Sequence, residues 1–225
     1  MIKTLYEKFQ PWSETGSIWI LSDPHFDDDD CKLMDVNWIT PQEQVDIINK
    51  MIHKNDTFIC LGDVGNTEWI KKIKAGYKVL ITGNHDAGVE NYKRKENYYL
   101  LNGETVADCK EKYKDFVCIC DDFRKYAYCD NRLFDEVYTG PLMISDKIIL
   151  SHEPIPGINW ALNIHGHQHN KHAESDEYHL NLCSNVIGYI PSNLNNIIKT
   201  GVLKNIDSLH RINIDKATAH PMKKK

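Results

Sequence analysis

The segment ITGNHDAG, residues 81–88, shows how the chain is built, because an apolar run ends abruptly in Gly, Asn, His and Asp. The run before it, KVLIT at 78–82, has the length and β-branched content of a buried strand. Four further strands are predicted at 17–22, 57–61, 147–152 and 161–166. The segments at their carboxyl ends are, in the same order, SDPHF, LGDVG, LSHEP and HGHQH. Polar side chains therefore gather where apolar strands end.

The order of elements in the first half predicts a parallel sheet. Helical patterns at 40–54 and 66–76 alternate with the first three strands, and such β-α-β-α-β order favours parallel pairing with right-handed crossovers. Thr40, Pro41 and Glu43 suit the N-cap, N1 and N3 positions of a capping box.

The second half of the sequence lacks the alternation of strands and helices seen in the first half. Residues 138–152 predict a hairpin around a Ser-Asp turn, and residues 191–201 are a helix candidate. We expect one α/β domain over residues 1–225, with 87–135 as an insertion or cap and 218–225 as a loose tail.

Composition limits the function classes. Of the 225 residues 41% are hydrophobic and 26% charged, which is ordinary for a globular protein, and the net charge of −5 argues against extended nucleic-acid binding. Neither a membrane-length apolar run nor the apolar core of a signal peptide occurs, so we expect a cytoplasmic protein with no membrane partner. The sequence leaves the oligomeric state open.

The seven cysteines are an odd number, and we interpret them as thiols in a reducing compartment. Cys109, Cys118, Cys120 and Cys129 have a poor spacing for a zinc knuckle. We favour the interpretation that Cys118 and Cys120 share one face of a strand as small apolar residues.

The polar residues at the strand ends predict a metal site, because sites in open α/β sheets form beyond the carboxyl ends of the strands. The candidates are Asp23, His25, Asp63, Asn84, His85, Asp86, His152, His167 and His169. Mixed nitrogen and oxygen ligands suit first-row transition metals or zinc, and the oxygens shift the preference toward manganese. Asp63, central in the expected strand order, is the natural candidate to bridge two ions about 3.5–4 Å apart.

The ordered motifs D-x-H, G-D, G-N-H-D, H and G-H-x-H, spread over roughly residues 17–190, resemble the calcineurin-like metallophosphoesterase superfamily, in particular its small bacterial and phage members. This resemblance implies a two-sheet mixed β-sandwich flanked by helices and a site for two metal ions. It assigns one ion to Asp23, His25, Asp63 and His169, and the other to Asp63, Asn84, His152 and His167.

The resemblance also implies roles beyond metal binding. His85 would act as general acid or stabilise charge on the phosphoryl group, and Asp86 would orient His85 from behind. His85 and Asn84 would contact substrate. Apart from the resemblance, the basic run at 91–99 makes Arg94 a further candidate for substrate binding, although we favour a solvated helix face for this run.

One departure concerns the residues after His25, where related proteins often continue with Phe-Gly-His. Here the run is Phe followed by four aspartates, Asp27–Asp30. These carboxylates would repel an anionic substrate unless they point away from it or hold a cation.

The function expected from these motifs is metal-dependent hydrolysis of phosphoesters, with small or nucleotide-type phosphodiesters as first choice. The attacking hydroxide would be activated by two divalent ions, with Mn²⁺ favoured and Fe, Zn, Ni or Mg as alternatives. A phosphomonoesterase or nucleotide pyrophosphatase is the alternative enzyme. A non-catalytic metal-binding scaffold of the same fold is the alternative from another class.

Overall fold

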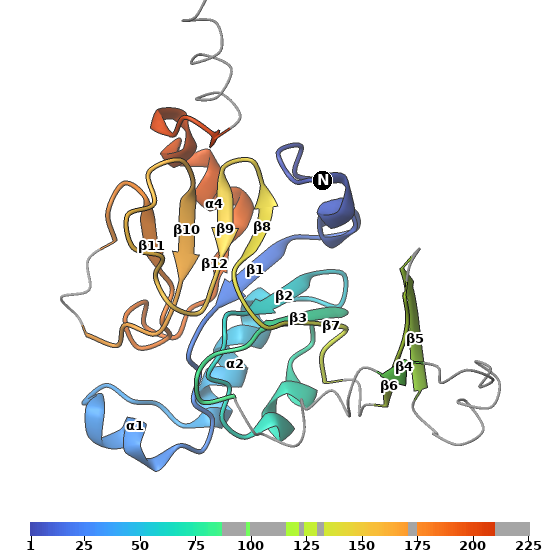
Figure 1. Cartoon of the computed structure of the whole chain (residues 1–225). Coiled ribbons are helices and arrows are strands. Elements are labelled where there is room, and N and C mark those ends of the chain that lie inside the picture. The colour runs from blue at the N-terminus through green and yellow to red at the C-terminus, as the bar shows by residue number, and fades with distance from the viewer. Residues whose placement is uncertain (87–97, 100–115, 122–123, 130–132, 171–174, 210–225) are drawn as a thin grey trace, which may run out of the picture.

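The computed structural model describes residues 1–86, 98–99, 116–121, 124–129, 133–170 and 175–209, and it contains two sheets that pack against each other (Figure 1). The larger sheet has the strand order β12-β1-β2-β3-β7. Its strands are β1 (Ile18–Leu21), β2 (Thr57–Cys60), β3 (Tyr77–Ile81), β7 (Glu136–Tyr138) and β12 (Ser192–Asn193). Strands β1, β2 and β3 run parallel, as the sequence predicts. Strand β7, which the sequence does not predict, extends this parallel set, and the short β12 pairs antiparallel with β1.

The second sheet has the order β11-β10-β9-β8. It consists of β8 (Leu142–Ser145), β9 (Ile148–Leu150), β10 (Leu162–His165) and β11 (His179–Asn181). The antiparallel pair β8–β9 is the predicted hairpin, whereas β9, β10 and β11 run parallel.

The helices begin where the sequence places their caps. Helix α2 (Pro41–Met51) starts with a capping box, in which the Thr40 hydroxyl accepts the Glu43 N–H and the Glu43 carboxylate accepts the Thr40 N–H. The helix predicted at 66–76 is a shorter 3-10 helix, η2 (Thr67–Lys72), which Asn66 caps. The remaining helices are η1 (Glu7–Ser13), α1 (Asp29–Met34), α4 (Leu194–Lys199) and η3 (Val202–Asn205).

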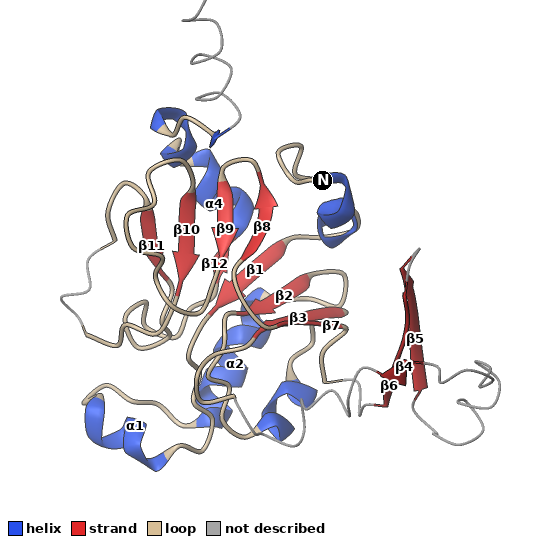
Figure 2. Cartoon of the chain, in the orientation of Figure 1, coloured by secondary structure: helices blue, strands red, loops and turns tan. Residues whose placement is uncertain are grey.

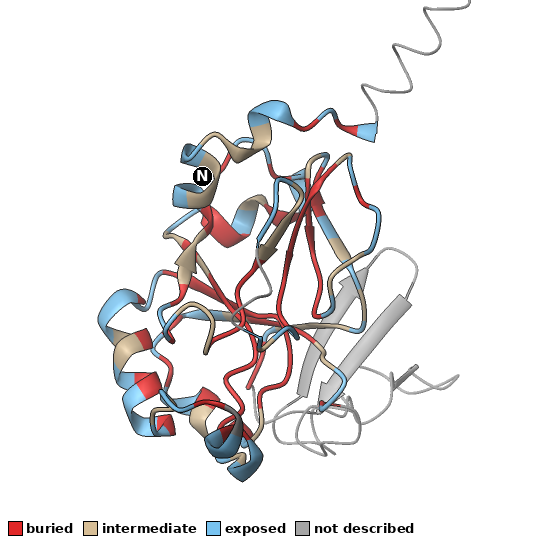
Figure 3. Cartoon of the chain, turned by 90° about the vertical axis from the view of Figure 1, so that its left-hand side faces the viewer, coloured by how far each residue is buried: buried red, intermediate tan, exposed pale blue. Residues whose placement is uncertain are grey.

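The strands at the centre of the molecule are largely buried (Figure 3). Alternation along them divides the apolar residues between two core layers. The layer between the sheets contains Ile18, Ile20, Ile59, Leu61, Val79 and Ile81 from one side, and Ile144, Ile148, Leu150, Leu162 and Ile164 from the other. Helix α2 lies against the opposite face of the larger sheet (Figure 2). There Phe58, Cys60 and Leu80 pack with Val45 and Ile48. The predicted two-sheet sandwich flanked by helices is thereby confirmed.

Strands β4 (Tyr98–Tyr99), β5 (Phe116–Asp121) and β6 (Arg124–Cys129) form a separate antiparallel sheet in the order β4-β6-β5. Most of the predicted insertion at 87–135, including Arg94 and Cys109, lies outside the described residues, as does the tail at 218–225. In the part of the chain that the structure describes, no helix is long and apolar enough to cross a membrane.

Candidate metal centre

The loops after the strands hold their polar residues in an unusual backbone conformation. Asp23 and His25 after β1, Asp63 after β2 and His167 after β10 have φ angles of 54°, 42°, 51° and 65°. The left-handed region costs a non-glycine residue roughly 1–2 kcal/mol. Such backbone outliers concentrate at functional sites, where the surrounding structure holds them in place.

Two glycines allow these loops to approach one another closely. A Cβ atom added at Gly83 would lie 2.7 Å from the Asp63 nitrogen and 2.8 Å from His152 Cε1. A Cβ atom added at Gly166 would overlap the Asp23 carboxylate and the Ser22 hydroxyl. Both glycines are therefore required for close packing around the polar cluster.

The first group of candidate ligand atoms lies at the ends of β1, β2 and β10. Asp23 Oδ1 is 3.4 Å from His169 Nε2 and 3.9 Å from His25 Nε2, which is in turn 3.7 Å from Asp63 Oδ2. Among the described residues, Asp23 Oδ1 and His25 Nε2 are buried without a hydrogen-bond partner. Unpaired buried polar atoms are costly, and a cation between these two would satisfy both.

The second group lies at the ends of β3, β9 and β10. His152 Nε2 is 2.8 Å from Asn84 Oδ1, 3.2 Å from His167 Nδ1 and 3.3 Å from Asp63 Oδ2. His167 Nδ1 is also 3.1 Å from Asn84 Oδ1. Within each group, the candidate ligand atoms lie within 4.8 Å of one another. One group contains Asp63, His152 and His167, and the other contains Asp23, His25 and Asp63. Asp63 therefore belongs to both groups.

Four of the predicted ligands are histidines: His25, His152, His167 and His169. Oxygen atoms fix the orientation of three of these imidazoles. The Leu61 carbonyl is 2.9 Å from His152 Nδ1, and Asn185 Oδ1 is 3.2 Å from His169 Nδ1. Asp28 Oδ2 is 3.0 Å from His25 Nδ1. These contacts hold Nδ1 away from the cluster and leave Nε2 as the nitrogen that faces it and that a cation would take, which is the usual arrangement around metal-binding histidines.

Comparison with known proteins identifies the family. The model of the calcineurin-like phosphoesterase family matches residues 16–182. The chain belongs to this family. No functionally curated protein matches the sequence.

Two solved structures are similar to this member of the family. A protein of unknown function from Aquifex aeolicus is 18% identical with a TM-score of 0.52, and the match covers 82% of this chain and 98% of that one. The nuclease MPE from Pseudomonas putida is also 18% identical, with a TM-score of 0.36 over 68% of this chain and 60% of that one. The first of these supports the fold alone.

The carboxylates and imidazoles of the cluster shift one another's pKa values. Burial disfavours the charged carboxylate of Asp23, but His169 and His152 lower its pKa below the ordinary value. Burial also opposes the charged form of His152, yet Asp63 and Asp23 raise the pKa of this imidazole to about 9. The Asp23 carboxylate, whose Oδ1 lies 3.4 Å from His169 Nε2, likewise raises the pKa of His169. The carboxylates and imidazoles of the cluster thus favour each other's charged forms.

His85 lies beside the ligand cluster with its side chain exposed. Its backbone N–H donates to Asp63 Oδ1 at 2.8 Å, and its ring centroid is 5.6 Å from that of His25. An exposed imidazole in this position is accessible to a substrate bound over the cluster. The structure thus brings His85 together with the predicted ligands Asp23, His25, Asp63, Asn84, His152, His167 and His169.

Asp86 makes bonds that the sequence does not predict. Its Oδ2 accepts the backbone N–H groups of Asp63 at 2.9 Å and Gly83 at 2.8 Å, and its Oδ1 accepts that of Val64 at 3.0 Å. The carboxylate therefore ties the loop after β2 to the loop after β3. The structure gives Asp86 a positioning role toward Asp63, where the sequence predicts one toward the ring of His85.

The aspartate run at 27–30 has its own partners. Asp27 Oδ2 accepts hydrogen bonds from Asn66 Nδ2 at 2.8 Å and Trp69 Nε1 at 2.6 Å, and Asp29 pairs with Lys32 on α1. These two carboxylates are engaged away from the ligand cluster. Sequence reasoning does not foresee these contacts, nor those of Asn185 and Cys183 with His169, because they depend on how distant loops meet.

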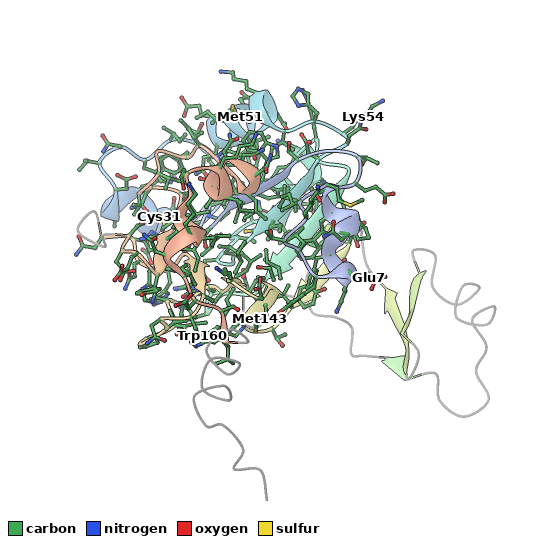
Figure 4. The ribbon with its side chains drawn as sticks, turned by 90° about the horizontal axis from the view of Figure 1, so that it is seen from above. Glu7, Cys31, Met51, Lys54, Met143 and Trp160 are labelled. Atoms are coloured by element: carbon green, nitrogen blue, oxygen red, sulfur yellow. The ribbon has the colours of Figure 1, made fainter. Side chains whose placement is uncertain are left out.

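Two concave regions accompany the sandwich. The ligand cluster borders a small cavity of about 10 Å³, lined in part by Asp23, His25 and Cys31. A larger cleft of about 490 Å³ is lined by Lys54 and by Tyr77, the first residue of β3, and so lies at the opposite end of the strands. Cys31 and Lys54 are well separated in Figure 4.

Proposed function

We propose that this protein hydrolyses small or nucleotide-type phosphodiesters with the help of two divalent metal ions. The observation that carries the proposal is the position of Asp63 Oδ2, 3.3 Å from His152 Nε2 and 3.7 Å from His25 Nε2. One carboxylate oxygen thereby faces both groups of ligands, which is the geometry that a bridging ligand requires. Membership of the calcineurin-like phosphoesterase family supports hydrolysis of a phosphoester as the reaction.

The residues present fit such ions. Asp23, His25, Asp63 and His169 would hold one ion, and Asp63, Asn84, His152 and His167 the other. Imidazole nitrogens with carboxylate and amide oxygens suit Mn²⁺, with Fe, Zn, Ni or Mg as alternatives. When bound, two such ions supply Lewis acidity toward the phosphoryl oxygens and lower the pKa of a water molecule between them.

The protein's own contribution beyond the ligands centres on His85. Its exposed imidazole is the group best placed to donate a proton to the departing alcohol oxygen, or to stabilise negative charge on the phosphoryl group. Asn84 and His85 are both exposed, so a small substrate can reach the cluster from solvent. This accessibility favours small diesters over substrates that need a deep pocket.

The test is hydrolysis of bis(p-nitrophenyl) phosphate by the Mn²⁺-loaded protein, with His85→Ala as the matched variant. We expect turnover that falls at least about 100-fold in the variant, the usual contribution of a general acid, while its metal content stays at the parent level. Loss of metal in the variant would reassign His85 as a ligand.

The alternatives give different results in the same assay. Hydrolysis of p-nitrophenyl phosphate or of a nucleotide pyrophosphate bond, without hydrolysis of the diester, would favour the phosphomonoesterase or the pyrophosphatase. Metal binding with no turnover of any of these substrates would favour the non-catalytic scaffold.

We also propose a cytoplasmic location, which rests on the cysteines. Cys31, Cys60 and Cys183 are free thiols in the described residues, as expected in a reducing compartment. Fractionation of the source cells with detection by antibody would test this location, and recovery outside the cytoplasm would contradict it.

A further inference from the structure

We propose that Asp28 is a positioning residue that sets the tautomer of His25 and so directs His25 Nε2 at the ion between Asp23 and Asp63. This inference rests on the proposed metal site. Asp28 Oδ2 is 3.0 Å from His25 Nδ1, and the side chains are 31% and 5% exposed, respectively. Among the four aspartates at 27–30, Asp28 is the one paired with a predicted ligand.

Two opposing attractions act on the proton of His25. Nε2 faces two buried carboxylates, 3.9 Å from Asp23 Oδ1 and 3.7 Å from Asp63 Oδ2, and both would favour a proton on Nε2. An Nε2–H group cannot bind a cation. The carboxylate of Asp28 only accepts hydrogen bonds, so it favours the proton on Nδ1 and leaves the Nε2 lone pair free. Consistent with that outcome, Nε2 is buried without a hydrogen-bond partner in the described part of the chain.

Asp28 is itself held in place at a second point. Its Oδ1 accepts the Asp30 N–H at 3.0 Å and thereby caps α1, and its backbone N–H donates to the His25 carbonyl at 3.1 Å. The turn from His25 to Asp28 and the cap of α1 thus fix the carboxylate before an ion binds. A preorganised acceptor loses little side-chain entropy when it orients the imidazole.

The neighbouring aspartate provides a matched control. Asp29 carries the same charge one residue along the chain, but it is 86% exposed and pairs with Lys32. Asp28→Ser keeps an oxygen suited to capping α1, because serine is a preferred N-cap residue, yet its short side chain no longer reaches His25. Asp29→Ser removes one charge without touching the ligand cluster.

The first measurement is Mn²⁺ affinity of the full-length metal-free protein, with free Mn²⁺ followed by electron paramagnetic resonance. We expect Asp28→Ser to weaken the affinity of one of the two sites by about 10–100-fold, the usual effect of losing a partner of a metal-binding histidine. Asp29→Ser is expected to stay within about twofold of the parent, as surface substitutions do. Equal affinities in the two variants would overturn the proposal.

The second measurement is ¹⁵N NMR of the His25 ring in the parent metal-free protein at alkaline pH, which does not depend on the folding of a variant. We expect the proton on Nδ1. A proton on Nε2, alone or together with Nδ1, would overturn the proposal. If the parent protein binds no Mn²⁺ at all, the proposed function fails, whereas the tautomer of His25 is still decided by the NMR result.

Discussion

Replacing Asp86 with alanine is expected to destabilise the metal-free protein, because three backbone N–H groups lose their shared acceptor. The N–H groups of Asp63 and Val64 are buried and that of Gly83 is partly buried. A hydrogen bond to a charged group contributes about 1.5–3 kcal/mol, so the two buried bonds alone amount to about 3–6 kcal/mol. Burial raises the pKa of Asp86, which shows that its charged form is costly in the fold, and alanine removes that cost. We therefore expect a net loss of about 3–4 kcal/mol.

The assay is urea unfolding in the presence of a chelator, followed by tryptophan fluorescence. With an m-value of about 2–3 kcal/mol/M, the expected loss moves the midpoint down by about 1–2 M urea. Asp86→Asn keeps one acceptor oxygen and is expected to fall between the parent and Asp86→Ala. An unchanged midpoint in Asp86→Ala, together with slower turnover at full metal content, would refute this reasoning and support a role of Asp86 toward the ring of His85.

Two further outcomes follow from the same geometry. Gly83→Ala places a Cβ atom 2.7 Å from the Asp63 nitrogen and 2.8 Å from His152 Cε1, so we expect reduced manganese content by mass spectrometry, and a full complement of metal would contradict this. The folded-state pKa of His152, raised to about 9, means that its protonated form stabilises the metal-free protein at low pH and that this stabilisation is lost as the pH rises through 9. The thermal midpoint of the metal-free protein should therefore fall, and Mn²⁺ affinity measured by calorimetry should rise, between pH 7 and pH 9. Affinity that is independent of pH would contradict the account of His152.

The sequence predicts that these polar side chains come together, because strand ends are a local signal. Apolar runs that stop at Asp23, Asp63 and Asn84 place these residues at one edge of a parallel sheet, whatever the details of the loops. The capping box at Thr40 is predicted for the same reason, since its bonds join residues that are neighbours in the sequence. The helix after Asn66 is correctly capped in the prediction but adopts the tighter 3-10 form.

The residues that support the cluster are harder to predict, because their partners are set by tertiary structure. Nothing local to Asp86 indicates that the N–H groups of Asp63 and Val64 will point at its carboxylate. The run Asp27–Asp30 suggests a uniform negative patch, yet the fold gives Asp27 and Asp28 different partners. Backbone strain at the ligand residues and the Asn185 contact of His169 likewise become visible only in three dimensions.

The central claim is that Asp63 bridges two metal ions, and anomalous diffraction from crystals grown with Mn²⁺ tests it most directly. The account predicts two anomalous peaks about 3.5–4 Å apart, both within coordination distance of the Asp63 carboxylate. It also predicts His25 Nε2 at one peak and His152 Nε2 at the other. A single peak, or two peaks of which only one contacts Asp63, would contradict it.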